Sequence, residues 1–264
     1  MDLFANWIAA LVERHSSSLS RPELLRAIRA LSARYVERRA ELDRRSPTDS
    51  AGKRAAFAAF YAPLHFLTVR GIVREVDAAG AGVDRLIDLG CGTGVAGAAW
   101  ALALPGPAPI RGVDREGWPL DEARWNWRQL GLRGRTQRGD LVAAAHELVA
   151  RRTRREAGGA GLVLGWSVNE LDRAARAALL PSLLGAADQG ASVLVVEPIA
   201  RSAVPWWDEW ASAFAGAGGR ADEWRLPADL PPILLDLDRS AGFDRQELAA
   251  RSLWVTAASP PHPA

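Results

Sequence analysis

Leu86-Ile87-Asp88-Leu89-Gly90-Cys91-Gly92-Thr93-Gly94 is the stretch of the sequence that decides the fold. It lies where an apolar strand ends and a helix of small residues begins. Glycines let the chain turn sharply at such a point and let a ligand approach the backbone closely. The GxGxG spacing, the acid two residues before it and the strand–turn–helix context predict a ligand-binding turn. The alternative is an unrelated glycine turn in another α/β protein.

Short apolar runs alternate with helical stretches from residue 84 onwards. Strands are predicted over residues 85–89, 110–113, 162–166, 192–196 and 253–256, and the helices between them include 96–104, 121–130 and 172–184. This alternation indicates βαβ units and a parallel sheet. Because ligands gather at the carboxyl ends of such strands, we expect the site at that edge.

Helical spacing of apolar residues dominates the part of the chain before the sheet. Residues 1–45 are predicted to be helical, and Ser20 with Pro22 is typical of a helix start. A further helix runs to about Tyr61, and Pro63 is expected to kink or restart it. We therefore predict an N-terminal helical segment over residues 1–80, an α/β domain over 81–258 and a disordered tail over 259–264.

Residues 86–94 resemble motif I of class I, S-adenosylmethionine-dependent methyltransferases. The resemblance implies a Rossmann-like α/β sheet and S-adenosylmethionine as cofactor. In that family the glycine turn packs against the cofactor, and the acid before it supports the loop and the cofactor's amino group. The implied cofactor-binding residues of the turn are Asp88, Gly90, Cys91, Gly92 and Gly94.

Two further acids follow predicted strands. Asp114 lies 20 residues after Gly94 and could accept both ribose hydroxyls, although it could also be a surface cap. Its neighbour Arg115 is included among the expected cofactor contacts. By the same resemblance, Asp140 would accept from the adenine amine with Leu141 on the ring. The alternative for Asp140 is an N-cap of the helix over 141–150.

The methyl-transfer site of the family lies after the fourth strand, where this chain has Trp166-Ser167-Val168-Asn169-Glu170-Leu171. Trp166 is the expected cofactor contact, and Asn169 and Glu170 are the candidate catalytic residues. Glu170 could act as a base or orient a substrate, or it could cap the next helix. The Asn/Asp-Pro-Pro-Tyr tetrapeptide of many enzymes that methylate amino groups on nucleic acid bases or glutamine is missing here, which argues against such substrates without excluding them. Three nearby tryptophans, Trp206, Trp207 and Trp210, could form a substrate wall or pack a helix on the sheet.

Composition limits the other possibilities. The single cysteine, Cys91, excludes an internal disulfide and four-thiolate metal sites, and the four histidines are scattered, so no metal is expected. The net charge is only +2, and its basic residues are nearly all arginine, a bias that alone establishes no nucleic-acid partner. Without a signal peptide or an apolar run of roughly 20 residues, we expect a cytoplasmic protein that binds no membrane.

A narrower resemblance is to the ribosomal small-subunit methyltransferase-like family, meaning mitochondrial assembly factors and their bacterial relatives. It rests on short matches, among them 32–35, 61–65, Trp166 to Leu171 and Val196-Glu197-Pro198. The cysteine cluster of the mitochondrial members is missing. The resemblance implies ribosomal RNA or a ribosomal protein as partner.

Two other functions are open. A non-catalytic assembly factor would hold the cofactor and contact RNA through arginines such as Arg38, Arg39, Arg44, Arg45 and those at 151–155. A nicotinamide-dependent dehydrogenase is disfavoured by the GxGxG spacing. If the chain is a methyltransferase, we expect residues 1–80 to form a lid that closes the site, with Tyr61, His65 or Arg70 reaching the ligand.

Overall fold

The computed structural model describes residues 3–16, 19–37, 50–150 and 159–256, without the side chains of 33–37. The chain divides into two compact units, one made of Met1–His65 with Leu226–Leu248 and the other of Phe66–Arg225 with Ala249–Ala264. These bounds differ from the predicted 1–80 and 81–258, because 226–248 joins the N-terminal helices from the far end of the sequence. The predicted tail, 259–264, lies outside the described residues.

The second unit is built on a sheet that has seven strands among the described residues. The strands are β1 (Arg85–Leu89), β2 (Ile110–Asp114), β3 (Gly134–Arg138), β4 (Ala160–Gly165), β5 (Ser192–Pro198), β6 (Arg220–Pro227) and β7 (Glu247–Val255). Their order is β3-β2-β1-β4-β5-β7-β6. The first five are parallel, and β7 runs antiparallel to β5. The α/β, Rossmann-like fold class predicted from the sequence is confirmed.

The burial of each strand explains which strands the sequence could predict. The central strands β4 and β5 are buried almost throughout, as parallel strands covered on both faces must be. The edge strand β3 is exposed along nearly its whole length, and the other edge strand, β6, alternates between exposed and part-buried residues. Both carry polar sequences and were missed by a search for apolar runs.

One face of the sheet is covered by α5 (Val95–Ala101) and α6 (Gly117–Gln129), which come close because facing residues are small. Trp127 of α6 donates its indole N–H to the Gly94 carbonyl at 2.8 Å. A Cβ on Gly134 would lie 2.1 Å from the Trp127 ring, and one on Gly112 would lie 2.8 Å from it. Glycines on β2 and β3 therefore make room for the helix that borders the candidate site.

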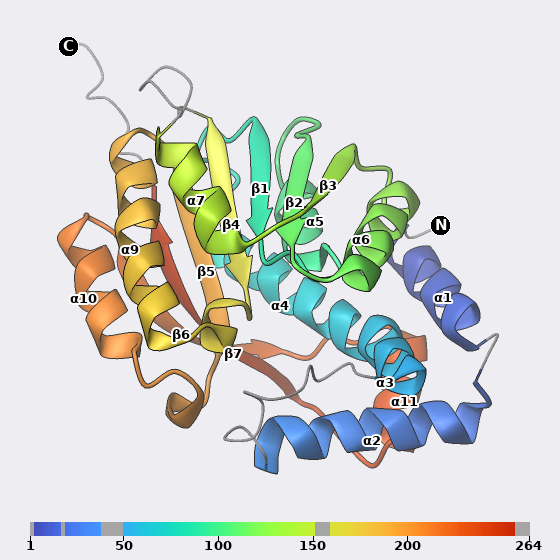
Figure 1. The fold of residues 1–264 in the computed structure, drawn as a ribbon. Helices are drawn as coiled ribbons and strands as arrows, with labels where there is room; N and C mark the ends of the chain where they lie inside the picture. The colour runs from blue at the N-terminus through green and yellow to red at the C-terminus, as the bar shows by residue number, and fades with distance from the viewer. Residues whose placement is uncertain (1–2, 17–18, 38–49, 151–158, 257–264) are drawn as a thin grey trace. The chain divides into compact units, whose positions relative to one another are not determined.

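The opposite face is covered by α7 (Leu141–Ala150), α9 (Arg173–Asp188) and α10 (Trp207–Gly216), which stand in front of the sheet in Figure 1. Their apolar sides form one core with residues of β1, β4 and β5. The ring centroids of Trp206 and Trp210 lie 4.8 Å apart in this core, and Trp207 is also buried. Of the two readings of these tryptophans, packing of a helix on the sheet is confirmed.

The first unit contains helices. They are α1 (Leu3–Ser16), α2 (Arg21–Glu37), α3 (Ala51–Ala56), a π-helical turn η2 (Phe57–Tyr61), the start of α4 (Ala62–Glu75) and α11 (Pro232–Ser240). The helix start at Ser20 is confirmed, since the Glu23 carboxylate accepts from the backbone N–H and the hydroxyl of Ser20 at 2.8 and 2.6 Å. At the expected irregularity the chain forms a π-helical turn, which ends just before Pro63, a residue with no N–H to donate.

One helical stretch of the described residues is long and apolar enough to cross a membrane by length and composition alone, although the sequence analysis found no apolar run of roughly 20 residues. The helical stretch Ala51–Glu75 has 25 residues and a mean hydropathy of 1.4 in its most apolar window, 78% of which is buried inside the protein. Burial of this kind is what a core helix of a soluble protein shows.

Candidate functional site

The glycine turn after β1 has left-handed backbone angles at all three glycines, with φ of +69° at Gly90, +49° at Gly92 and +76° at Gly94. A Cβ on Gly90 would lie 2.6 Å from the Ser167 Cβ, and one on Gly94 would lie 2.7 Å from the indole nitrogen of Trp127. A Cβ on Gly92 would have no described atom within 4 Å. Packing therefore requires glycine at the two ends of the turn, while the middle glycine faces open space.

Asp88 lies under the turn with its carboxyl group fully buried. Its Oδ2 accepts from the Gly97 N–H at 2.9 Å, and its Oδ1 has no hydrogen-bond partner among the described residues. Burial, with a smaller contribution from the charge of Asp114, raises the pKa of Asp88 to about 8. The orphaned oxygen is suited to a hydrogen-bond donor of a ligand or a bridging water.

Asp114 ends β2 and ties its carboxylate to the glycine turn. Its Oδ2 accepts from the Gly92 N–H at 2.9 Å, and its Oδ1 accepts from the Glu116 N–H at 2.9 Å. A carboxylate has about four acceptor positions, so two stay open for hydroxyl groups. Asp114 and the glycine turn, which the sequence spacing linked, therefore lie side by side in the structure.

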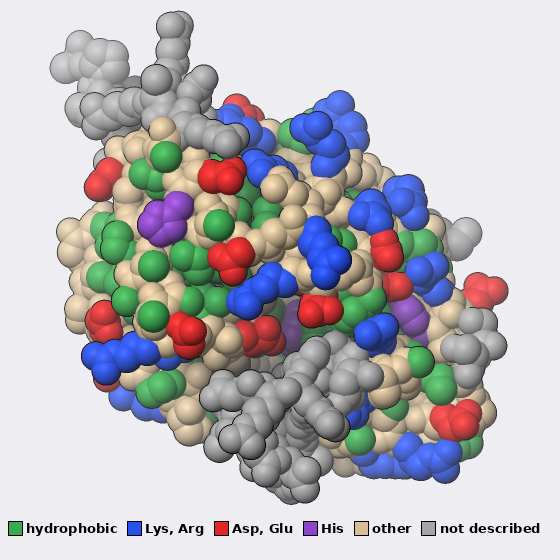
Figure 2. Space-filling view, viewed as in Figure 1, with side chains coloured by type: hydrophobic (Ala, Val, Ile, Leu, Met, Phe, Trp, Pro, Cys, Tyr) green, Lys and Arg blue, Asp and Glu red, His purple; other side chains and the backbone are tan. Residues whose placement is uncertain are grey.

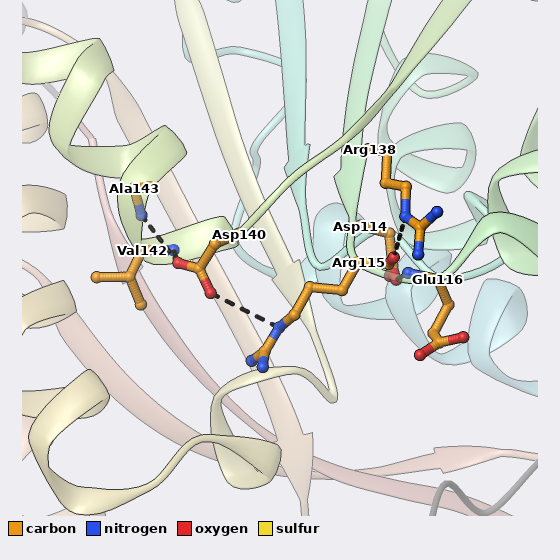
Figure 3. Close-up of polar contacts among 7 residues, drawn as sticks. All are labelled: Asp114, Arg115, Glu116, Arg138, Asp140, Val142 and Ala143. Carbon is orange, nitrogen blue, oxygen red and sulfur yellow. Dashed lines mark hydrogen bonds and ion pairs between the residues drawn. The ribbon is translucent and has the colours of Figure 1, made fainter.

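Asp140 is the N-cap of α7, one of the two roles considered for it. Its Oδ1 accepts from the N–H groups of Val142 and Ala143 at 2.9 and 3.0 Å, as Figure 3 shows. Its Oδ2 lies 3.6 Å from the Arg115 Nε, and both side chains are largely exposed. Leu141 is buried in the core beneath α7, where it faces Gly90. Contact of Asp140 and Leu141 with an adenine ring stays a prediction.

The chain leaves β4 through a strained residue. Trp166 has φ of +55°, a left-handed conformation that costs energy for a bulky side chain. Its N–H donates to the Val196 carbonyl at 2.8 Å, and the next residue, Ser167, donates its hydroxyl to the Leu89 carbonyl at 3.2 Å. These bonds fasten the exit of β4 to β5 on one side and to β1 on the other, beside the glycine turn.

Glu197 is a buried carboxyl group that the sequence did not single out as a site residue. Its Oε1 accepts from the N–H groups of Val168 and Asn169 at 2.9 and 3.3 Å, and its Oε2 has no hydrogen-bond partner among the described residues. Burial raises the pKa of Glu197 to about 8. It therefore fixes η3 (Val168–Glu170), the turn that carries both candidate catalytic residues, to the end of β5. An acid within an apolar strand was the one available signal.

The two candidate catalytic residues have different surroundings. The Asn169 Oδ1 is buried and has no hydrogen-bond partner among the described residues, whereas Glu170 is an exposed residue. The proposal that Glu170 caps the next helix is wrong, because Asp172 is the N-cap of α9 and accepts from the Ala175 N–H at 2.7 Å.

These residues meet at the carboxyl ends of β1, β2, β4 and β5. The strand order reverses between β1 and β4, and open α/β sheets bind ligands in the crevice at such a point. Within 3–16, 19–37, 50–150 and 159–256, no group of three or more His, Cys, Asp or Glu could hold a metal ion.

The predicted lid residues lie in both units. The Tyr61 hydroxyl donates to the Ile28 carbonyl at 3.1 Å, and the His65 ring lies 5.8 Å from that of Phe57, all in the first unit. In the second unit, the Arg70 guanidinium lies 5.9 Å from the Phe66 ring. The lid stays a prediction. The arginines at 38, 39, 44, 45 and 151–155 lie outside the described residues.

No model of a known protein family matches the chain, and no curated protein matches it. Three solved structures with a similar fold illustrate the structural likeness. A SAM-dependent methyltransferase from Aquifex aeolicus is 12% identical with a TM-score of 0.46, over 75% of this chain and 93% of that one. Magnesium protoporphyrin IX methyltransferase from Synechocystis, with bound SAH, is 12% identical with a TM-score of 0.45, over 74% and 84%. A cyclopropane-fatty-acyl-phospholipid synthase-like protein from Lactobacillus casei is 14% identical with a TM-score of 0.47, over 76% and 93%. The fold class rests on the strand order of this chain, and these distant likenesses add no argument about function.

Proposed function

We propose that the protein is an S-adenosylmethionine-dependent methyltransferase. The observation that carries the proposal is the glycine turn at the switch point of the sheet. Its open side lies at Gly92, whose N–H is held by Asp114, and the orphaned carboxyl oxygen of Asp88 lies beneath it. Open backbone, a carboxylate with free acceptor positions and a buried acceptor are the groups that a nucleoside with an amino-acid tail requires.

When bound, S-adenosylmethionine supplies an electrophilic methyl group on a sulfonium. In our proposal Asp114 accepts from the ribose hydroxyls, while Asp140 and Leu141 border the adenine. Trp166 and Arg115 flank the cofactor, and nothing in this role requires a metal. The remaining task of the protein is to orient the acceptor and exclude water.

The turn after β4 is the proposed acceptor side. The buried Asn169 Oδ1 would accept a hydrogen bond from the methyl acceptor, and Glu170 would orient the acceptor or take its proton. Glu197 holds this turn through two N–H bonds, so the position of Asn169 depends on a residue outside the reaction. In this proposal the protein accelerates methyl transfer mainly by holding the acceptor and the methyl group in the correct relative position.

For the acceptor we propose ribosomal RNA in the cytoplasm. The support is the similarity of Trp166 to Leu171 and of Val196-Glu197-Pro198 to the ribosomal small-subunit methyltransferase-like family. The two segments are also neighbours through the Glu197 bonds to Val168 and Asn169.

Transfer of a tritiated methyl group from S-adenosylmethionine tests the proposal. Small-subunit ribosomal RNA and ribosomal proteins would be offered separately, with wild type, Asn169→Ala and the exposed control Gln129→Ala. We expect label in RNA with wild type and the control, and a loss of at least tenfold with Asn169→Ala. Label in protein alone would overturn the choice of acceptor. S-Adenosylhomocysteine binding without transfer to either fraction would instead indicate a non-catalytic assembly factor.

A further inference from the structure

Five arginines form a track along the β3 edge of the sheet. All five are exposed, and they are Arg111 of β2, Arg128 of α6, Arg133 just before β3, and Arg135 and Arg138 of β3. In Figure 2, basic side chains gather over β2, β3 and α6 at the upper right of the molecule. We call these five residues the arginine track.

Like charges are neighbours within the track. Arg111 and Arg135 are register partners on adjacent parallel strands, so their side chains leave the same face of the sheet. Like charges placed side by side on a sheet destabilise it. The Arg111 guanidinium donates to the neutral Gln137 Oε1 at 2.6 Å, and none of the five arginines forms an ion pair with a described carboxylate. An external anion would relieve this repulsion.

Most nearby acids are already engaged. Asp121 pairs with Arg124, Asp140 caps α7 and lies near Arg115, and Asp114 accepts from two backbone N–H groups. Glu116 is exposed and lies beyond the carboxyl end of β2. Charges on an edge strand also discourage pairing with another sheet. That role needs only scattered charges and does not account for two arginines in register.

The track leads to the candidate site. From Arg133 to Arg138 the chain rises about 16 Å, at roughly 3.3 Å per residue. At the carboxyl end of β3, the Arg138 Nε donates to the Arg115 carbonyl at 2.9 Å. Arg115 directly follows Asp114 and faces Asp140, as Figure 3 shows. Arg133 and Arg135 leave one face of the sheet and Arg138 leaves the other, so an RNA backbone would have to follow the exposed β3 edge to reach all three, and it would then arrive at the turn proposed to hold the cofactor.

We propose that the arginine track binds the phosphate backbone of single-stranded RNA and guides it to the site. The inference rests on the proposed function and names the surface that its acceptor would use. Guanidinium groups match phosphate oxygens bidentately. Among the described residues, the large apolar side chains that are exposed are Leu3, Leu102 and Ile233, none on α6, β2 or β3, so the track lacks the apolar residues of a membrane surface.

The test is fluorescence anisotropy with a labelled single-stranded RNA of about 12 nucleotides, titrated at several salt concentrations. The variant Arg133→Glu/Arg135→Glu changes two outward-facing side chains of the track. The matched control, Arg173→Glu/Arg201→Glu, makes the same charge change at two exposed arginines on the α9 side of the unit. Each phosphate contact with a single strand contributes about 0.7 to the slope of log affinity against log salt. We expect the track variant to bind at least tenfold more weakly with a slope reduced by about 1.4, and the control to bind like wild type.

Equal losses of RNA affinity in the two variants would overturn the proposal that the arginine track binds RNA, since net charge alone would then explain binding. So would a wild type that binds no RNA at low salt, or one that binds anionic phosphatidylserine vesicles but not RNA. Tighter binding of DNA than of RNA of the same sequence would overturn the choice of RNA. Calorimetry with S-adenosylhomocysteine separates the two proposals, because both variants should keep wild-type affinity for it. RNA binding by a wild type that does not bind S-adenosylhomocysteine would overturn the proposed function and leave the track standing.

Discussion

Replacing Glu197 tests how the turn after β4 is held. Its Oε1 accepts from two backbone N–H groups, and its side chain is 0% exposed. Glu197→Ala leaves both buried N–H donors without a partner, at about 1–3 kcal/mol each, so we expect a loss of about 2–6 kcal/mol in the free energy of unfolding. Glu197→Gln keeps an oxygen acceptor of the same shape and cannot titrate, which makes it the informative variant.

The pH dependence has a definite sign. The pKa of Glu197 is raised from 4.5 to about 8 by burial, so between these values the folded protein holds a proton that the unfolded chain releases. Its contribution to stability is therefore full below about pH 4.5 and is lost as the pH rises towards 8. One proton corresponds to a slope of about 1.4 kcal/mol per pH unit. Burial also raises the pKa of Asp88 to about 8. Asp88 therefore adds a slope of the same sign to the pH dependence of stability, and it does so equally in wild type and in Glu197→Gln.

Urea unfolding followed by tryptophan fluorescence at pH 5, 6, 7 and 8 measures the difference. The free energy of unfolding of wild type should fall relative to Glu197→Gln by about 1 kcal/mol per pH unit across this window. Because every other titrating group is shared, the difference belongs to Glu197. Parallel curves for the two proteins would refute the reasoning, since Glu197 would then titrate alike in the folded and unfolded chains.

Three other substitutions or reagents test individual contacts. Asp114→Ala should lower S-adenosylhomocysteine affinity tenfold or more by calorimetry, since two charge-assisted hydrogen bonds are worth about 1.5–3 kcal/mol each; an unchanged affinity would remove Asp114 from the ribose site. Gly94→Ala should destabilise the fold by more than about 1 kcal/mol in urea, because its Cβ would lie 2.7 Å from the Trp127 indole nitrogen at a φ of +76°, and no loss relative to the open control Gly106→Ala would contradict that packing. Cys91 is buried and burial raises the pKa of its thiol, so it should react with a disulfide reagent only on unfolding; rapid reaction of the folded protein at pH 7 would contradict its placement.

The sequence predicted the elements whose burial leaves a plain pattern. Parallel strands covered on both faces are continuous apolar runs, so β1, β4 and β5 could be read directly. The GxGxG turn and Asp114 could be linked because consecutive parallel strands end at the same edge of the sheet. The helix start at Ser20 followed from local side-chain chemistry alone.

What the sequence left open depends on contacts between distant segments. The edge strands β3 and β6 are stabilised by pairing, and their exposed, polar residues carry no apolar signal. Glu197 holds Val168 and Asn169 from nearly 30 residues away, a bond with no local signature. The joining of 226–248 to the N-terminal helices likewise depends on tertiary packing. The strain at Trp166 is visible only once the backbone angles are known.

Isothermal titration of the wild-type protein with S-adenosylhomocysteine, and separately with NAD, tests the central claim most directly. The glycine turn with its open side at Gly92 and the carboxylate of Asp114 predicts saturable binding of S-adenosylhomocysteine. At 100 times the dissociation constant, binding should raise the free energy of unfolding by about 2.7 kcal/mol. NAD should produce no comparable heat. Saturable NAD binding together with no response to millimolar S-adenosylhomocysteine would contradict the account and assign the turn to a dinucleotide.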